Sequence, residues 1–589
     1  MEIYKIIEEE IRSYMEDPVE ISDGHHYLQS KLIKRIHVYA NKVYPGGKVD
    51  SQGNYKYWFD VQDPRIDSEV KNIDFDTKDI LLYSENQKDN VAVIIANLAI
   101  DQWMKETKVY SKINDAVEEG SGWGNVIWKK IKGGFEKLDP LNTYVINTTA
   151  KTLEDSPVIE RHVLTQSQMR AKSESWDQAK MEEAITSGGN KSFSSQKDTN
   201  KKETQIPYYE IFERNGEISI HDLKEAQGKS GSEADKKKYV YAKVVVCGLE
   251  KSEGGGSADT TYVLYAKELK SGIPYKEYHR GRYKGRWWRE GLYEILFDIQ
   301  TRANEIGNQI AQGLEYSSKI VLKSSENLLV ENIMTDIMNG DIVKSKDLSQ
   351  VKLEIPGMAQ LVTDWNNLMI LADKLANSYE VVQGETSSNV PFRSTALLNI
   401  NANKLFNFLR EKLAGALEEV FEEWICPQLL EDIKAKDILT LTGDPEYLKK
   451  YYEILTNTWY LQNLVAIGPH NPEIAEALKA EKMEQLQTRK KVLIRINKKL
   501  WRGLKVRTKI VISGENVNIA SDLETLATFI KMEVDPVRRQ ALIEKAMAMK
   551  GIDVSSLPKS NPEALQKGGP AELPKEPGKL DKILDTAKK

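Results

Sequence analysis

The chain has 589 residues, of which 40% are hydrophobic and 29% charged, a composition typical of a folded protein with several domains and not of a disordered one. Its longest largely apolar run, Val91–Ile100, is about half as long as a membrane-spanning helix requires. The net charge of −5 gives no overall attraction to nucleic acid, and the two distant cysteines exclude a disulfide framework and zinc-ribbon spacing, which favours assembly in a reducing cytoplasm.

Residues 1–283 are predicted to be a mixed α and β region. Apolar residues at helical spacing predict helices near residues 1–15, 27–43 and 90–103. A glycine-rich entry at Gly120–Gly124 precedes a series of β-prone runs, which lie at residues 125–131, 135–147, 158–165, 206–214 and 237–250. Polar segments rich in Gly, Ser and Lys are expected to be mobile loops, at residues 187–204, 225–238 and 251–261.

Residues 284–316 carry the clearest helical pattern, and a helix from Trp288 to Tyr316 would be roughly 43 Å long. Its apolar residues alternate between steps of four and three and form a narrow seam: Leu292, Leu296, Ile299, Ala303, Ile306 and Ile310. Neutral amides flank the seam at Gln300, Asn304 and Asn308. A buried bundle helix normally has a wider apolar face, so the pattern favours a helix that packs against few neighbours, as in a ring, with another face wet.

The segments that follow alternate in character. Residues 317–357 contain short β-prone runs, a turn and a small helix, and residues 358–382 carry a second long helical stripe. This stripe is interrupted in residues 383–394, where Gly384 and Pro391 disfavour a continuous helix. The sequence therefore predicts a small α/β insert between two long helices, followed by a short polar loop.

Residues 395–550 are predicted to be mostly helical, beginning with a third long helix whose apolar face runs from Leu398 to Trp424. Within them, residues 489–509 hold ten Lys and Arg and no acidic residue. This block can contact phosphate or form a solvated helical face with a strand edge, and its candidate phosphate ligands are Arg495, Lys498, Lys499 and Arg502. Residues 551–589 hold five of the 19 prolines and are expected to be a flexible tail.

The chain carries no recognisable catalytic constellation. It lacks the phosphate loop, the dinucleotide-binding glycine motif, the H-E-x-x-H zinc motif and the serine elbow of hydrolases. His25 and His26 could bind a metal, but a solvated surface pair is the more common role of adjacent histidines. Asp74 and Asp76 could hold a cation, although acidic residues before a helix usually act as caps. We therefore expect no enzymatic activity, no cofactor and no metal.

A basic and aromatic stretch, "HRGRYKGRWWRE", lies at residues 279–290. Arginine interleaved with aromatic residues can bind nucleic acid by phosphate pairing and base stacking. The same mixture also stabilises domain junctions, where arginines pair with neighbouring carboxylates and indoles fill the space between a sheet and a helix. The sequence favours the junction without excluding nucleic-acid binding.

Three strings and their order resemble a known family. The strings are "DAVEEGSGWGNVIWKKIKGGFEKLDPLNTYVIN" at residues 115–147, "GLYEILFDIQTRANEIGNQIAQ" at residues 291–312 and "GETSSNVPFRSTALLNI" at residues 384–400. The sequence is similar in these strings, and in the order of segments over roughly residues 75–550, to portal proteins of tailed double-stranded-DNA bacteriophages, which are head-to-tail connectors, here of the podovirus or crAss-like type. The N-terminal 70 residues and the long polar loops are not part of the shared pattern.

The resemblance implies an elongated, ring-forming α+β portal fold. Residues 1–283 would be the N-terminal part of an α/β wing, and residues 395–550 the C-terminal wing with a helical crown. The stem would consist of a first helix in residues 284–316 and a second in residues 358–382. Between them lies a small α/β clip, residues 317–357, and after them a tunnel loop, residues 383–394. The flexible tail is residues 551–589.

The resemblance also implies a function. A portal is a homo-oligomeric ring, usually a dodecamer, at one vertex of the capsid, and it is the conduit for genome packaging and ejection. Its partners would be double-stranded DNA in the channel, the large terminase subunit, head-tail adaptor and tail proteins, and the major capsid protein, without a membrane. The protein would be assembled in the cytoplasm of a bacterial host and reside in the virion.

On this interpretation the seam contacts neighbouring subunits, and Gln300, Asn304 and Asn308 line the channel without the tight phosphate pairing of Arg or Lys. The DNA-facing tunnel loop would comprise Gln383, Gly384, Glu385, Thr386, Ser387, Ser388 and Asn389. The main alternative is a non-enzymatic cytoplasmic scaffold or assembly protein that does not act on DNA. An enzyme with an unrecognised site is the third.

Overall fold

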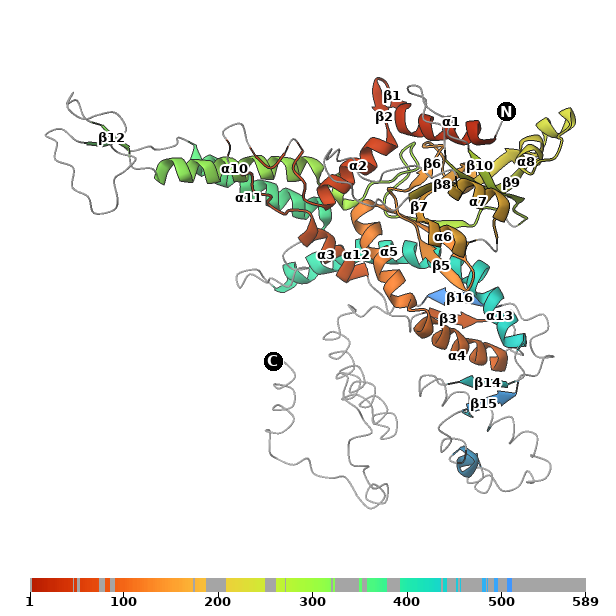
Figure 1. The fold of residues 1–589 in the computed structure, drawn as a ribbon. Helices are drawn as coiled ribbons and strands as arrows, with labels where there is room; N and C mark the ends of the chain where they lie inside the picture. The colour runs from red at the N-terminus through yellow and green to blue at the C-terminus, as the bar shows by residue number, and fades with distance from the viewer. Residues whose placement is uncertain are drawn as a thin grey trace, which may run out of the picture. The chain divides into compact units, whose positions relative to one another are not determined.

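The computed structural model describes residues 3–45, 47–49, 53, 55–73, 80–84, 90–172, 175–186, 208–248, 261–270, 272–318, 321–323, 349–351, 357–378, 392–435, 438–441, 452–453, 456, 479–483, 485, 492–495 and 506–510. The chain divides into two compact units, residues 1–512 and 513–589, and all described residues belong to the first. This unit combines helices with several sheets (Figure 1), which confirms the predicted α+β class. The helices predicted beyond residue 512 and the proline-rich tail lie outside the described residues.

A five-stranded antiparallel sheet has the strand order β10-β9-β8-β7-β6. Its strands are β6 (Thr143–Val145), β7 (Val158–Thr165), β8 (Tyr208–Ser219), β9 (Tyr239–Cys247) and β10 (Tyr262–Glu268). Helices cover both faces: α1 (Ile3–Glu16) and α8 (Ile220–Ala226) on one, α6 (Gln166–Ala171) and α7 (Gln178–Thr186) on the other. In β9, Val244 and Val246 pack on the first face and Val245 and Cys247 on the second, which explains the continuous apolar run "VVVC".

A three-stranded sheet and several helices form the largest apolar core. The strand order is β11-β4-β5, with β4 at Asn125–Ile131, β5 at Gly134–Lys137 and β11 at Tyr275–His279. The helices are α4 (Asn90–Glu106), α5 (Val109–Trp123), α12 (Phe392–Val420), the π-helical turn Phe421–Ile425 and α13 (Cys426–Ala435). Two long-range strand pairs adjoin them: β3 (Ile80–Tyr83) with β16 (Arg507–Ile510), and β14 (Ile438–Leu441) with β15 (Val492–Arg495).

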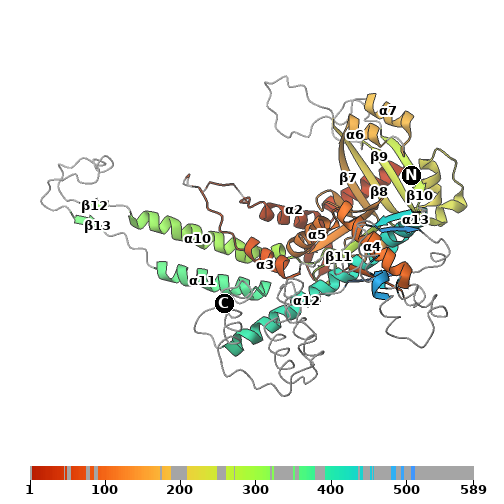
Figure 2. The same cartoon turned by 90° about the horizontal axis from the view of Figure 1, so that it is seen from below.

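Two long helices, α10 (Phe297–Ser318) and α11 (Met358–Ala376), lie side by side in both views (Figures 1 and 2). The short strands β12 (Val321–Lys323) and β13 (Ser349–Val351) follow α10 and precede α11 in sequence, and they pair antiparallel. Three helices pack near the first residues of α10 and the last residues of α11. They are α2 (Gln29–Ala40), α3 (Asp63–Ile73) and the one-turn helix α9 (Leu292–Ile295). β1 (Val19–Ser22) and β2 (His25–Tyr27) form a separate hairpin.

The structure corrects several sequence-based boundaries. The first long helix does not begin at Trp288. Trp287 and Trp288 lie in a bent, non-helical segment and are buried in the core that contains α2; helical structure begins at Leu292 and is interrupted at Leu296. The second ends at Ala376, where Asn377 adopts a left-handed conformation with a φ of 53°.

Two more expectations are wrong. The glycine-rich segment Gly120–Trp123 is the last turn of α5, which ends at the left-handed Gly124. Residues 225–238, expected to be a mobile loop, contain the end of α8 and a 3-10 helix, Glu233–Lys237, with a capping box at Ser232. Residues 187–204 and all of 251–261 except Thr261 lie outside the described residues.

Candidate functional site

The predicted seam packs within the chain, against α11. Leu296, Ile299 and Ala303 are buried in one cluster with Val61 and Ala372. Half-buried side chains of α11 complete this cluster: Trp365, Leu368 and Met369. Of the other seam residues, Leu292 and Ile306 are buried and Ile310 is half-buried. The expectation that this seam contacts neighbouring subunits is therefore corrected, since a second apolar stripe of the same chain already covers it.

The neutral amides of α10 bind an extended segment of backbone, and we call them the amide ladder: Gln300, Asn304 and Asn308. The backbone N–H groups of Val61, Phe59 and Tyr57 donate to the side-chain oxygens of the three amides in that order, at 2.9, 2.8 and 2.8 Å. In return, Gln300 Nε2 donates to the carbonyl of Phe59 at 2.6 Å and Asn308 Nδ2 to that of Tyr57 at 2.9 Å. The segment pairs with the helix as it would with the edge of a sheet.

The spacing of the two partners explains why this arrangement is possible. Four residues of an α-helix rise about 6 Å, and two residues of an extended chain advance about 6.6 Å. The ladder amides are four residues apart and the backbone donors two apart, so three successive pairs stay in register. Gly307 lets the segment approach, because a Cβ there would lie 2.4 Å from the ring of Phe59.

The amide ladder contradicts the prediction that these residues line a channel. Gln300 and Asn304 are 0% and 3% exposed, and both side-chain oxygens and the Gln300 nitrogen bond to backbone groups. Asn308 is half-buried and also donates to the hydroxyl of Tyr44 at 2.8 Å. A side-chain amide carries both a donor and an acceptor, so it can replace a peptide group, which explains why amides occupy these positions.

α11 leaves apolar side chains exposed on both sides of its buried face. Leu371 and Leu375 are 45% and 43% exposed, and each comes one residue before a buried alanine, Ala372 or Ala376. They therefore lie about 100° around the helix from the face that contacts α10. On the other side two further side chains are exposed, Val362 and Ile370. In the single chain these flanks are apolar surface without a partner among the described residues.

Two hollows adjoin the amide ladder. A shallow apolar groove of about 360 Å³ lies between α10 and α11, lined by Phe59, Gly307, Ile310, Ala311, Leu314, Val362 and Trp365. A second hollow of about 370 Å³ lies beside Tyr39, Tyr44 and Trp58, opposite the polar side chains of α10. Leu314 at the rim of the groove is largely exposed, so apolar surface continues from α11 onto α10.

The basic and aromatic stretch forms a junction between β11 and α9. Arg280 donates two hydrogen bonds to the fully buried Glu69, at 2.6 and 2.7 Å. Arg286 lies 2.6 Å from Glu294. Trp287 and Trp288 are buried with residues of α2, β4 and β11. For these side chains the junction interpretation is correct. Arg282 and Arg289 lie on the same stretch but form no salt bridge among the described residues, although the charge of Glu277 attracts Arg289.

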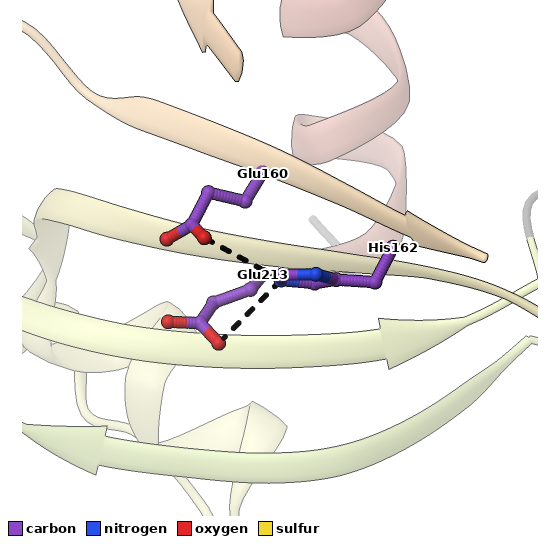
Figure 3. A group of neighbouring side chains, drawn as sticks. All are labelled: Glu160, His162 and Glu213. Atoms are coloured by element: carbon purple, nitrogen blue, oxygen red, sulfur yellow. Dashed lines mark ion pairs between the residues drawn. The ribbon is translucent and has the colours of Figure 1, made fainter. Parts of the chain in front are cut away.

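A buried charged cluster lies in the five-stranded sheet, and Figure 3 shows three of its residues, Glu160, His162 and Glu213. The carboxylates of Glu160 and Glu213 share the ammonium group of Lys129, at 2.6 and 2.8 Å, and Lys243 lies 2.7 Å from Glu213. Burial opposes ionisation of Glu213, but the two ammonium groups overcome this effect and hold its pKa below the usual range. Burial lowers the pKa of His162 to about 4, so this imidazole is neutral at pH 7.

His162 and the two glutamates have the composition of a metal site. The Nε2 atom of His162 lies 3.5 Å from Glu160 Oε2 and 4.0 Å from Glu213 Oε2 (Figure 3), and all three atoms lie within 4.8 Å of one another. However, Lys129 and Lys243 already neutralise both carboxylates. A divalent cation would leave a buried excess of about two positive charges, which is unfavourable at low dielectric. The cluster is therefore an ion-pair network that joins β4 to β7, β8 and β9.

The other predicted site residues fall into two groups. Arg495 lies at the end of β15. His25 and His26 are exposed on β2, and they form no potential metal site with other side chains among the described residues. The remaining ones lie outside the described residues: the tunnel loop Gln383–Asn389, Asp74, Asp76, Lys498, Lys499 and Arg502. The structure therefore leaves the tunnel loop as a prediction.

Comparison with known proteins gives no family. No protein-family model matches the sequence, and no curated protein is significantly similar to it. None of the described helices is long and apolar enough to cross a membrane. The α10–α11 pair, with its exposed flanks and its intervening strands, is the feature of the described residues most suggestive of function.

Proposed function

We propose that this chain is the subunit of a phage portal, a ring at one capsid vertex through which the genome is packaged and ejected. The observation that carries the proposal is the arrangement of α10 and α11. These long helices pack side by side, and the chain between them begins and ends with the paired strands β12 and β13. This order and pairing support a stem of two helices joined by a clip.

The exposed flanks of α11 support assembly into a ring. Two helices alone leave Leu371 and Leu375 on one side and Val362 and Ile370 on the other in water. In a ring each helix pair has a neighbour on both sides, so both flanks become buried. Full burial of an aliphatic side chain contributes about 1.5–3 kcal/mol, and each of these is already half covered, so about four such side chains per subunit would stabilise association appreciably.

The same proposal assigns the remaining partners. The clip, residues 317–357, would dock the large terminase subunit during packaging and head-tail adaptor proteins afterwards. The tunnel loop, residues 383–394, would face DNA at the narrowest point of the channel. The amide ladder stabilises the stem from within the subunit and takes no part in contacting DNA.

The proposal is tested by measuring the particle mass of a variant in which aspartate replaces both leucines of one flank. Wild-type protein should form a ring of uniform mass, whereas L371D/L375D should remain monomeric, because each buried carboxylate would be unpaired at the interface. The control T363D places a carboxylate on an exposed polar position of the same helix and should assemble normally. Mass photometry of the three purified proteins measures this directly. Rings of normal mass from L371D/L375D would contradict the assignment of this flank to an interface.

A further inference from the structure

The junction between β11 and α9 holds three cations that form no salt bridge among the described residues: Arg282, Arg289 and Lys412. The nearby carboxylates bind other groups. Glu69 binds Arg280, and Glu290 binds Lys284 at 2.7 Å. Glu277 accepts a hydrogen bond from the Trp287 indole at 2.7 Å and lies 3.0 Å from His279, and its charge attracts Arg289 without a direct salt bridge. The junction therefore has an excess of positive charge.

Lys412 and Arg289 are held in place by backbone carbonyls rather than by acids. The ammonium group of Lys412, on α12, donates to the carbonyls of Arg280 and Gly281 at 3.0 and 3.1 Å. The guanidinium of Arg289 donates to the carbonyl of Lys151 at 3.2 Å and lies over the ring of Tyr283. Its Nε atom is buried and makes no hydrogen bond among the described residues.

The neighbouring positive charges affect the pKa of Lys412. Burial, together with the neighbouring guanidinium groups of Arg289, Arg280 and Arg282, lowers the pKa of Lys412 to about 8. Half-buried cations that repel one another are unfavourable unless an anion accompanies them. Elsewhere in the junction each such cation has a carboxylate, as Arg280 and Arg286 do. An anion from solvent would balance the positive charge that remains at this position.

We propose that Arg282, Arg289 and Lys412 form a binding site for a phosphate-type oxyanion. A tetrahedral oxyanion can accept hydrogen bonds from two guanidinium groups and an ammonium group at once, and guanidinium geometry matches two oxygens of one phosphate. Arg282 is exposed, so the ligand can enter from solvent, while Arg289 and Lys412 form the half-buried floor. The ligand is either a free phosphate or a phosphate of a nucleic-acid backbone. The site does not depend on ring assembly.

Isothermal titration calorimetry with inorganic phosphate tests the site at constant ionic strength. Wild-type protein should bind phosphate saturably, and R282Q/K412M should bind at least about tenfold more weakly, because two charge-assisted hydrogen bonds are lost. K412M keeps an unbranched side chain of similar length next to Phe408, whose ring centre lies 5.7 Å from the Lys412 ammonium, and R282Q changes an exposed residue, so both should fold. The single variant R282Q, measured alone, keeps the test valid if the double variant is unstable. The control K404M removes an exposed lysine from the same helix and should bind as wild type does.

Competition identifies the source of the phosphate. If a short DNA duplex displaces inorganic phosphate from wild-type protein and binds R282Q only with non-specific affinity, the ligand is a nucleic-acid phosphate. If the duplex does not compete, the ligand is a free phosphate. Either result supports the site. The absence of saturable phosphate binding by wild-type protein, or an equal loss of binding in K404M and R282Q, would overturn it.

Discussion

A side-chain amide has the same donor and acceptor as a peptide group, and α10 uses the acceptor three times in succession and the donor twice. Gln300, Asn304 and Asn308 hold the backbone of Tyr57–Val61, a segment some 240 residues earlier in the chain. The regular spacing of the amides is visible in the sequence, and their role as a ladder could have been suspected from it. Their partner could not, since nothing local in Tyr57–Val61 marks it as a strand that pairs with a helix.

Loss of one ladder amide should destabilise the protein. In N304L the N–H of Phe59 and the Nε2 of Gln300 each lose an acceptor at a buried position, so the free energy of unfolding should fall by about 1–3 kcal/mol. Urea denaturation of the purified variants measures this. The control Q309L removes an exposed amide from the same helix and should change stability by less than about 0.5 kcal/mol. Equal effects of the two substitutions would show that the ladder does not stabilise the fold.

At the scale of single elements, periodic patterns located several helices and strands correctly. Boundaries and strands that depend on tertiary contacts were not predicted. β7 matches its predicted range because β-branched and other apolar residues at both ends of a short run identify such a strand locally. The start of the first long helix was placed four residues too early, because Trp287 and Trp288 continue the helical pattern in sequence but lie in a bent segment that is buried in the core containing α2. β10 and β11 were missed, as they follow polar segments and rely on pairing with β9 and β4.

The charged cluster that joins β4 to the five-stranded sheet should make stability depend on pH. The pKa of His162 is about 4 in the folded protein, against a usual value near 6.5, because burial disfavours the charged imidazolium. The unfolded chain therefore binds a proton more readily between these values, so this contribution is fully present above pH 6.5 and is lost as the pH falls toward 4. The carboxylates of Glu160 and Glu213 and the ammonium groups of Lys129 and Lys243 face the same imidazole.

The substitution H162Q should reduce this dependence. Its side chain does not titrate, so the decline in unfolding free energy between pH 6.5 and 4 should be shallower than in wild type by up to about 3 kcal/mol. Urea denaturation at a series of pH values gives the comparison, with H25Q, which removes an exposed histidine, as the control. Parallel curves for wild type and H162Q would mean that the imidazole titrates normally in the folded state.

At the scale of the whole molecule, the described part of the chain exposes apolar side chains to solvent. The flanks of α11 and the rim residue Leu314 remain exposed beside the packed face through which the two helices contact each other. Contiguous apolar surface of this kind usually marks an interaction site. A closed ring of identical subunits would bury the two different flanks against each other, a heterologous contact that closes by rotation. The order of segments in the sequence predicted ring assembly. The flanks of α11 could be proposed as the contact surfaces only after the structure showed that the seam of α10 packs against α11 within the chain.

Cryo-electron microscopy of the purified full-length protein is the most direct test of the portal proposal. The proposal predicts closed rings of about 12 subunits in top views, with an axial opening wide enough for duplex DNA and with the α10–α11 pairs arranged around it. Density in which the flanks of α11 contact neighbouring subunits would support the assignment at the level of residues. A compact dimer without an axial opening, or a ring in which α11 faces solvent on both flanks, would contradict it.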